Sequence, residues 1–276
     1  MKKKRMITLG IVLFLVWMVW GNLSIAETHF TLSDEKVPES FDGLKIAHLS
    51  DIHDRNIKNA LYQPLEDVKP DIIVITGDLI DSREPDIKQA VALVESLQEF
   101  APVYFVTGNH EAWSGKFKSL EEGLLEAGVT ILNNDWIELE RDTATIKLLG
   151  VEDPSFKVGS NLMNEEAAVV ETMIRNLSDG SDTFSILLSH RPELFDVYRR
   201  NNIDLVLSGH AHGGQFRLPF IGGIIAPDQG LFPEYTAGMY KEESTRMIVS
   251  KGLGNSIIPI RFNNRAEIIF IELQSK

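Results

Sequence analysis

The sequence predicts an α/β fold in which short strands and helices alternate along the chain. Apolar runs rich in β-branched residues recur at lengths typical of buried strands. Between several of these runs, apolar residues follow the three- and four-residue spacing of an amphipathic helix. This alternation favours layered α/β packing. The expected strands are 44–49, 71–76, 102–107, 146–151, 184–189, 203–208, 246–250 and 266–273, and the helical spacing occurs within 87–97, 117–125 and 163–174.

The N-terminal segment, residues 1–26, has the pattern of a signal anchor or a signal peptide. A basic run at residues 2–5 precedes an uncharged segment at residues 6–26, whose apolar core covers 7–20. A helix of that length reaches about 30 Å, enough to cross the hydrocarbon of a bilayer. Acidic residues follow the segment, so the positive-inside rule predicts a cytoplasmic N-terminus and an extracytoplasmic body.

Two fates of this segment stay open. Trp17 and Trp20 resemble the interfacial aromatic residues of an uncleaved single-pass anchor in the cell membrane. Ser24 and Ala26 are small residues at positions that a signal peptidase recognises, and cleavage near Ala26 would secrete the body. The polar stretch that follows, 27–42, is expected to be a linker, and 43–276 to be one domain.

Composition limits the chemistry and the partners. The formal net charge of the whole chain is −13. The first 26 residues contain four basic residues, at 2–5, and no acidic one, so the net charge of the rest of the chain is −17. So acidic a body disfavours nucleic acid as a partner. The chain has no cysteine, which excludes disulfides, a cysteine nucleophile and thiolate zinc sites. Any metal must therefore be held by His, Asp, Glu or Asn, which suits Mn, Fe or Zn.

Metal-ligand residues gather where the expected strands end. Three runs end in S-D-I-H at 50–53, G-D-L-I-D at 77–81 and G-N-H-E at 108–111, and two later runs end in S-H at 189–190 and S-G-H-A-H at 208–212. An Asp and a His two residues apart, as in Asp51 and His53, point to one side of a strand and can hold one cation. Each Asp and His pair alone is more often a cap beside a surface or core histidine, but five clusters at strand ends predict a metal site.

The same clusters resemble the calcineurin-like metallophosphoesterases. The pattern of that family is D-x-H, G-D-x-x-D, G-N-H-[DE], a lone H and G-H-x-H, and this chain shows all five blocks in order between Asp51 and His212. The resemblance implies a four-layer fold, a β-sandwich flanked by helices, with these loops at one edge. It also implies a site that holds two divalent metal ions.

Residue roles follow from the resemblance, position by position. One metal is expected on Asp51, His53 and His212, the other on Asn109, His190 and His210, with Asp78 as the bridge. His110 matches the catalytic histidine, which binds no metal and protonates the leaving group, and Asp81 matches the carboxylate that hydrogen-bonds and orients it. Glu111 stands where the family more often has Asp, and its role stays open.

The expected function is metal-dependent hydrolysis of a phosphoester. Two cations about 3.5 to 4 Å apart can activate water as a hydroxide for in-line attack at phosphorus. Two alternatives are a non-catalytic binding module on the same fold and a metal-dependent nuclease or protein phosphatase. The block at 209–215, followed by R-L-P at 217–219, resembles a bacterial membrane-anchored phosphodiesterase branch. That resemblance suggests a phosphodiester or pyrophosphate of lipid or cell-envelope origin.

The segment after His212 permits two interpretations. Residues 216–240 mix apolar side chains with glycine and proline, which indicates a long ordered loop or hairpin. The apolar side chains either fold back into the core or form an apolar rim beside the metals that meets lipid.

Overall fold

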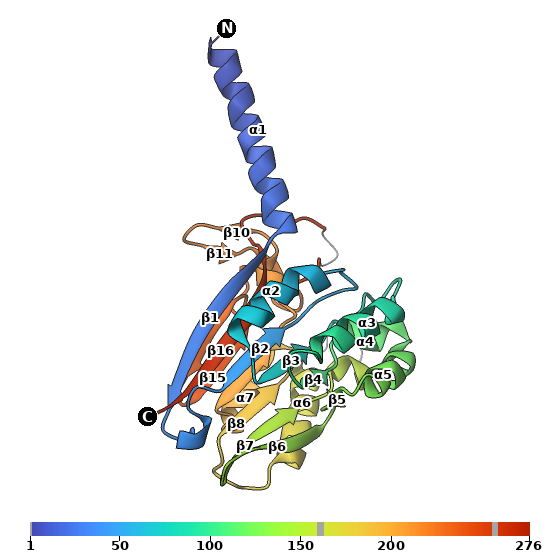
Figure 1. Cartoon of the computed structure of the whole chain (residues 1–276), viewed down its shortest axis with the longest axis vertical. Coiled ribbons are helices and arrows are strands. Elements are labelled where there is room, and N and C mark those ends of the chain that lie inside the picture. The colour runs from blue at the N-terminus through green and yellow to red at the C-terminus, as the bar shows by residue number, and fades with distance from the viewer. Residues whose placement is uncertain (1, 159–162, 256–258) are drawn as a thin grey trace.

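The computed structural model describes residues 2–158, 163–255 and 259–276, and it confirms the expected fold class. Two six-stranded sheets pack face to face, and helices cover their outer faces (Figure 1). All eight expected strands are present, and the three helical patterns fall on α3 (Ile87–Leu97), α5 (Phe117–Glu126) and α6 (Met163–Leu177).

The first sheet has the strand order β1-β16-β2-β3-β4-β5. Its strands β2 to β5 are parallel, β16 runs antiparallel to β2, and β1 pairs in parallel with β16 at the edge. The bounds are β1 (Ile25–Asp34), β16 (Ala266–Ser275), β2 (Lys45–Leu49), β3 (Ile72–Thr76), β4 (Val103–Val106) and β5 (Thr130–Ile131).

The second sheet has the strand order β14-β15-β9-β8-β7-β6. Its four central strands are parallel, and the two edge strands run antiparallel to their neighbours. The bounds are β14 (Gly238–Glu242), β15 (Thr245–Val249), β9 (Leu205–Ser208), β8 (Ser185–Leu188), β7 (Ala144–Gly150) and β6 (Asp135–Arg141). Two small hairpins, β10 (Arg217–Leu218) with β11 (Gly222–Gly223) and β12 (Ile225–Ala226) with β13 (Gly230–Leu231), lie outside both sheets.

The core forms three apolar layers because alternate side chains of each strand point to opposite faces of its sheet. On β3, Val74 lies in the core between the two sheets, whereas Ile73 and Ile75 lie under the helices. Helices α2 (Lys58–Val68), α3 and α5 cover the first sheet, and α6 and α7 (Phe195–Arg200) cover the second. The short helix α4 (Asn109–Ser114) and the 3₁₀ turns η1 (Glu39–Phe41), η2 (Pro154–Phe156), η3 (Pro192–Leu194) and η4 (His212–Gly214) complete the described elements.

The N-terminal helix α1 (Lys2–Leu23) projects away from the body, and its apolar side chains are exposed (Figure 1). It is the one helix in the described residues that is long and apolar enough to cross a bilayer. Only Ser24 separates it from β1.

The expected linker at 27–42 is instead part of the domain. Residues Ile25 to Asp34 pair with β16 along the whole strand, and η1 follows. Leu32 is buried in the core between the sheets and Phe30 packs against that core. Most other residues of this edge strand are polar. Too few apolar residues therefore alternate for the sequence pattern to indicate a strand.

Candidate metal centre

The seven candidate ligands come from the carboxyl ends of five strands, three in the first sheet and two in the second. They follow β2, β3, β4, β8 and β9, and all seven are buried: Asp51, His53, Asp78, Asn109, His190, His210 and His212. Hydrogen bonds join the two sets of loops. The His210 N–H donates to the Asp51 carboxylate at 3.0 Å, and the His190 ring bonds the Thr76 carbonyl at 2.7 Å. Both sheets thus contribute to one site, as the clustered strand ends predict.

A first group brings together Asp51, His53, Asp78 and His212, with one possible ligand atom of each within 4.8 Å of the others. The two Nε2 atoms of His53 and His212 face each other at 3.2 Å, and Asp51 Oδ1 lies 3.3 Å from the latter. Burial lowers the pKa of His53 to about 3, and burial also holds the pKa of His212 well below its usual value. Both rings are therefore neutral and offer lone pairs, the form in which imidazole binds metals.

A second group brings together Asp78, His190 and His210. Asp78 Oδ2 lies 3.2 Å from His190 Nε2, which in turn lies 3.2 Å from His210 Nδ1. The Asn109 Oδ1 atom is buried and has no hydrogen-bond partner among the described residues, which fits an oxygen ligand. Asp78 belongs to both groups and is the shared member that a bridging carboxylate would be.

Outer hydrogen bonds orient the rings of the second group. His190 donates from Nδ1 to the Thr76 carbonyl, so its Nε2 is the ring nitrogen directed at Asp78. His210 donates from Nε2 to Asp228 Oδ2 at 2.9 Å, so it offers Nδ1 instead. Such second-layer bonds fix the tautomer and ring orientation of metal-binding histidines. The hydrogen bond from His210 lowers the pKa of Asp228 to about 2.

A buried arginine supports this outer layer. Arg191 is almost fully buried and donates to both oxygens of Asp153, from Nε at 2.7 Å and from Nη2 at 3.1 Å. Its Nη1 donates to Asp228, the partner of His210. Arg191, Asp153 and Asp228 were not among the residues predicted from the sequence. The one sequence feature that could have indicated a supporting role for Arg191 is its position next to the candidate ligand His190.

Several candidate ligands are held in a backbone conformation that residues other than glycine rarely adopt. Asp51, His53, Asp78, His210 and His212 all have positive φ. Each such residue costs on the order of 1 kcal/mol or more and persists only where the surrounding structure enforces it. Glycine allows the close approach beside them: a Cβ at Gly209 would lie 2.3 Å from Asp51 Oδ2 and 1.8 Å from the Ser50 hydroxyl oxygen.

His110 lies beside the first group, but its contact with Asp81 differs from the expectation. The His110 ring meets the His53 ring edge to face at 4.4 Å between centroids. Its Nδ1 accepts the Ser82 N–H at 3.0 Å, whereas the nearest Asp81 oxygen is 4.0 Å away, too far for a hydrogen bond. Asp81 accepts instead from the backbone and side chain of Arg83. The Ser82 amide occupies the Nδ1 lone pair, so the neutral ring carries its proton on Nε2.

Glu111, whose role the sequence left open, ties two ligand loops together. Its buried carboxylate accepts four backbone N–H bonds, from Asp78 at 2.9 Å, Leu79 at 2.9 Å, Ile80 at 3.2 Å and Gly108 at 2.7 Å. It thereby connects the loop after β3 to the start of α4. Burial, followed by the charge of Asp78, raises the pKa of Glu111 to about 7. An acid three residues after Gly108 is the capping-box spacing, a signal that could have predicted the local bond.

Comparison with known proteins assigns the family. The family model for calcineurin-like phosphoesterases matches residues 44–214, which contain every candidate ligand. The chain belongs to the calcineurin-like phosphoesterase family. Its membership makes it a phosphoester hydrolase, and the buried Asp and His groups are the residues that could hold the divalent metals of such an enzyme. The expected enzyme class is confirmed, and the non-catalytic alternative has no support.

Similar proteins occur in bacteria and vertebrates. An uncharacterized metallophosphoesterase of Bacillus subtilis, YkuE, is 35% identical and matches 91% of this chain and 86% of its own. A zebrafish transmembrane protein with a metallophosphoesterase domain is 29% identical over 98% of this chain, which spans 63% of that protein. The crystal structure of TT1561 from Thermus thermophilus covers 76% of this chain and 90% of its own, with a TM-score of 0.53 at 15% identity, and shows the shared fold.

Proposed function

We propose that this phosphoesterase binds two divalent metal ions and hydrolyses a phosphodiester or pyrophosphate of lipid or cell-envelope origin at a membrane surface. The observation that carries the two-metal part is the pair of buried donor groups that share Asp78. Asp51, His53 and His212 would hold one ion, and the second group, with Asn109, would hold the other. When bound, two such ions supply an activated nucleophile and stabilise charge on the phosphoryl oxygens.

The protein itself would supply the proton for the leaving group. His110 lies at the edge of the first group, and the Ser82 amide lies against its Nδ1, so Nε2 is the ring nitrogen that would face the leaving group. The donor would be the protonated ring, which gives its Nε2 proton to the leaving oxygen and becomes neutral imidazole. A positioned imidazole is the usual group for general acid catalysis near neutral pH. We therefore propose His110 as the general acid. Asp81, at 4.0 Å, would act on it through charge alone.

The reaction class is tested with purified full-length protein on bis(p-nitrophenyl) phosphate, its monoester and DNA. We expect about two divalent ions per chain by elemental analysis, and hydrolysis that is fastest on the diester and is lost when a chelator removes the ions. Full activity of a metal-free sample would contradict the proposal. Preference for DNA would instead favour the nuclease alternative.

The same substrate also tests the side of the membrane on which the body lies. The basic run at 2–5, followed by an acidic body, supports an extracytoplasmic location. Intact cells should then hydrolyse the membrane-impermeant diester as fast as lysed cells. Activity that appears only after lysis would place the body in the cytoplasm.

The lipid part of the proposal rests on an apolar rim beside the metal centre. The rim consists of six exposed side chains: Leu218, Phe220, Ile221, Ile225, Leu231 and Phe232. The interpretation that these residues fold back into the core is therefore wrong for them. The loops that carry the rim follow His212 directly and include Asp228, the partner of His210. Their hairpin β10–β11 lies near the base of α1 (Figure 1).

Polar substitution of the rim separates the two kinds of substrate. Burial of such a side chain against an acyl chain is worth about 1.5 to 3 kcal/mol. The double variant Phe220→Ser with Ile221→Ser should therefore slow hydrolysis of a lipid-linked diester about tenfold or more, with no change on bis(p-nitrophenyl) phosphate. Leu125→Ser on α5 is a matched control, because Leu125 is 57% exposed against 58% for Ile221. Equal losses on both substrates, with a lower melting temperature, would show a structural role.

A further inference from the structure

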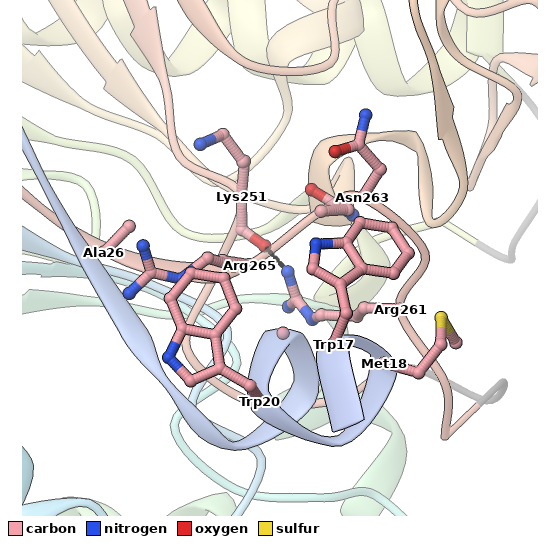
Figure 2. Close-up of a pocket in the computed structure, with 10 residues that line it drawn as sticks. Trp17, Met18, Trp20, Ala26, Lys251, Arg261, Asn263 and Arg265 are labelled. Atoms are coloured by element: carbon pink, nitrogen blue, oxygen red, sulfur yellow. Dashed lines mark hydrogen bonds between the residues drawn. The ribbon is translucent and has the colours of Figure 1, made fainter. Parts of the chain in front are cut away.

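A small cavity lies where α1 meets the body. Its volume is about 210 Å³, and it is lined by the last two turns of α1 and by residues of the segment 251–265. Figure 2 shows Trp17 and Trp20 of α1 around the side chains of Arg261 and Arg265. The two elements are joined directly: the ring of Trp17 meets Phe262 edge to face, and the Asn22 side chain bonds the backbone of Arg261.

Two guanidinium groups of this cavity have no carboxylate partner among the described residues. Arg261 is 2% exposed and donates to the carbonyls of Lys251 at 2.7 Å and Gly254 at 2.6 Å, while its Nε is buried without a partner. Arg265 donates to Ser24 and to the Ile25 carbonyl and stacks over Trp20. The cavity's lysine, Lys251, is by contrast paired with Glu267. A buried charge without an ion-pair partner is costly: burial lowers the pKa of Arg261 to about 10, although the charges of Asp51 and Glu267 act in the opposite direction.

The depth of the cavity points to its ligand. Tryptophan at the end of a membrane span sits at the level of the lipid headgroups. Trp17 and Trp20 close the apolar part of α1 and line the cavity, so both arginines lie at the depth of the lipid phosphates. Arginine is well suited to phosphate because its planar fork can donate two parallel hydrogen bonds. We infer that this cavity binds the headgroup phosphate of an anionic membrane lipid, in the leaflet that faces the catalytic body.

The competing role for these arginines is to fasten α1 to the body. Arg55 does this without lining the cavity: its guanidinium donates to the carbonyls of Asn22 and Leu23 at the end of α1 and to Leu253. Replacement of Arg55 therefore weakens the same junction and leaves both cavity arginines in place. This makes Arg55→Gln the matched control for Arg261→Gln with Arg265→Gln.

Tryptophan fluorescence gives a local readout of lipid binding. The full-length protein is reconstituted in vesicles of phosphatidylcholine that contain either brominated phosphatidylglycerol or brominated phosphatidylcholine. Bromine quenches only nearby indoles, so the signal comes from Trp17 and Trp20 and not from lipids that gather at the basic residues 2–5 at the other end of α1. A cation near an anionic lipid surface contributes about 1 kcal/mol. We expect the anionic lipid to bind about fivefold more strongly than the neutral one.

The variants decide between the two roles. The double arginine variant should lose the preference for phosphatidylglycerol, whereas Arg55→Gln and the charge-retaining Arg261→Lys should keep it. Equal quenching by the two brominated lipids in the unmodified protein would overturn the inference, as would loss of the preference in Arg55→Gln. Displacement of the brominated lipid by millimolar glycerol 3-phosphate would show a site for soluble phosphate instead. The inference rests on α1 as an anchor and not on the reaction, so a protein without diesterase activity can still show the preference.

Discussion

Asp78→Asn should cause the largest loss of both metal binding and hydrolysis. Asp78 Oδ2 lies 3.2 Å from His190 Nε2 and 3.7 Å from His53 Nε2, one histidine from each donor group. Burial alone would raise the pKa of Asp78, but the surrounding histidines hold it well below its usual range, so the group is a carboxylate. Asparagine keeps the shape and the oxygen that accepts the His110 backbone N–H, but it removes the charge that the two proposed ions would share.

We expect kcat to fall about a thousandfold or more, because bound ions supply several kcal/mol of transition-state stabilisation. Metal content should fall below one ion per chain. His53→Asn is the control, because His53 belongs to the first donor group only. This variant should retain part of the metal content that the second group holds. A variant Asp78→Asn that keeps two ions and a tenth of the activity would show that Asp78 does not bridge them.

His110→Ala should have the second largest effect, and it should spare the metal content. His110 contacts the ring of His53 but is absent from both donor groups that share Asp78. Loss of a general acid costs typically about 10²- to 10⁴-fold, and the cost grows with the pKa of the leaving group. We therefore expect a large fall in kcat on an alkyl phosphodiester and a small one on bis(p-nitrophenyl) phosphate.

Asp81→Asn is the informative comparison for His110. At 4.0 Å the Asp81 carboxylate makes no hydrogen bond to the ring, so this variant should cost less than tenfold in kcat on both substrates. Metal loss in proportion to activity in His110→Ala would make His110 a ligand. An effect of Asp81→Asn as large as that of His110→Ala would restore the orienting role expected from the sequence.

The sequence predicted the central strands because each is an apolar run buried on both faces. Residues 72–76, for example, are all buried and need no alternation to be recognised. Edge strands escaped prediction because one of their faces meets water. On β6 every residue is exposed or half-buried, and the run from Asp135 to Arg141 contains four charged side chains. The same reason explains why β1 resembled a linker.

The candidate ligands were predictable because each stands in a short motif at the end of a strand. Their supports were not, because those contacts join residues far apart in the chain. Arg191 donates to Asp153 and Asp228, which lie 38 and 37 residues away in the sequence. Short-range sequence patterns do not indicate pairs at such separations. The predicted hydrogen bond between Asp81 and His110 was wrong because the backbone N–H of the next residue, Ser82, bonds the ring instead. Any residue but proline offers such an N–H, so the residue type at that position does not indicate the bond.

The pairing of β1 with β16 sets an order of events during synthesis. Ile25 lies opposite Ala266 and Ala26 opposite Glu267, so the residues just after α1 find their partner only when residues 266–275 have left the ribosome. A signal peptidase needs an extended, unpaired substrate, and a cut near Ala26 would have to precede this pairing. Once β1 has paired with β16, the potential cleavage site near Ala26 is part of a sheet. Pairing of β1 with β16 would therefore protect the bond near Ala26 from cleavage.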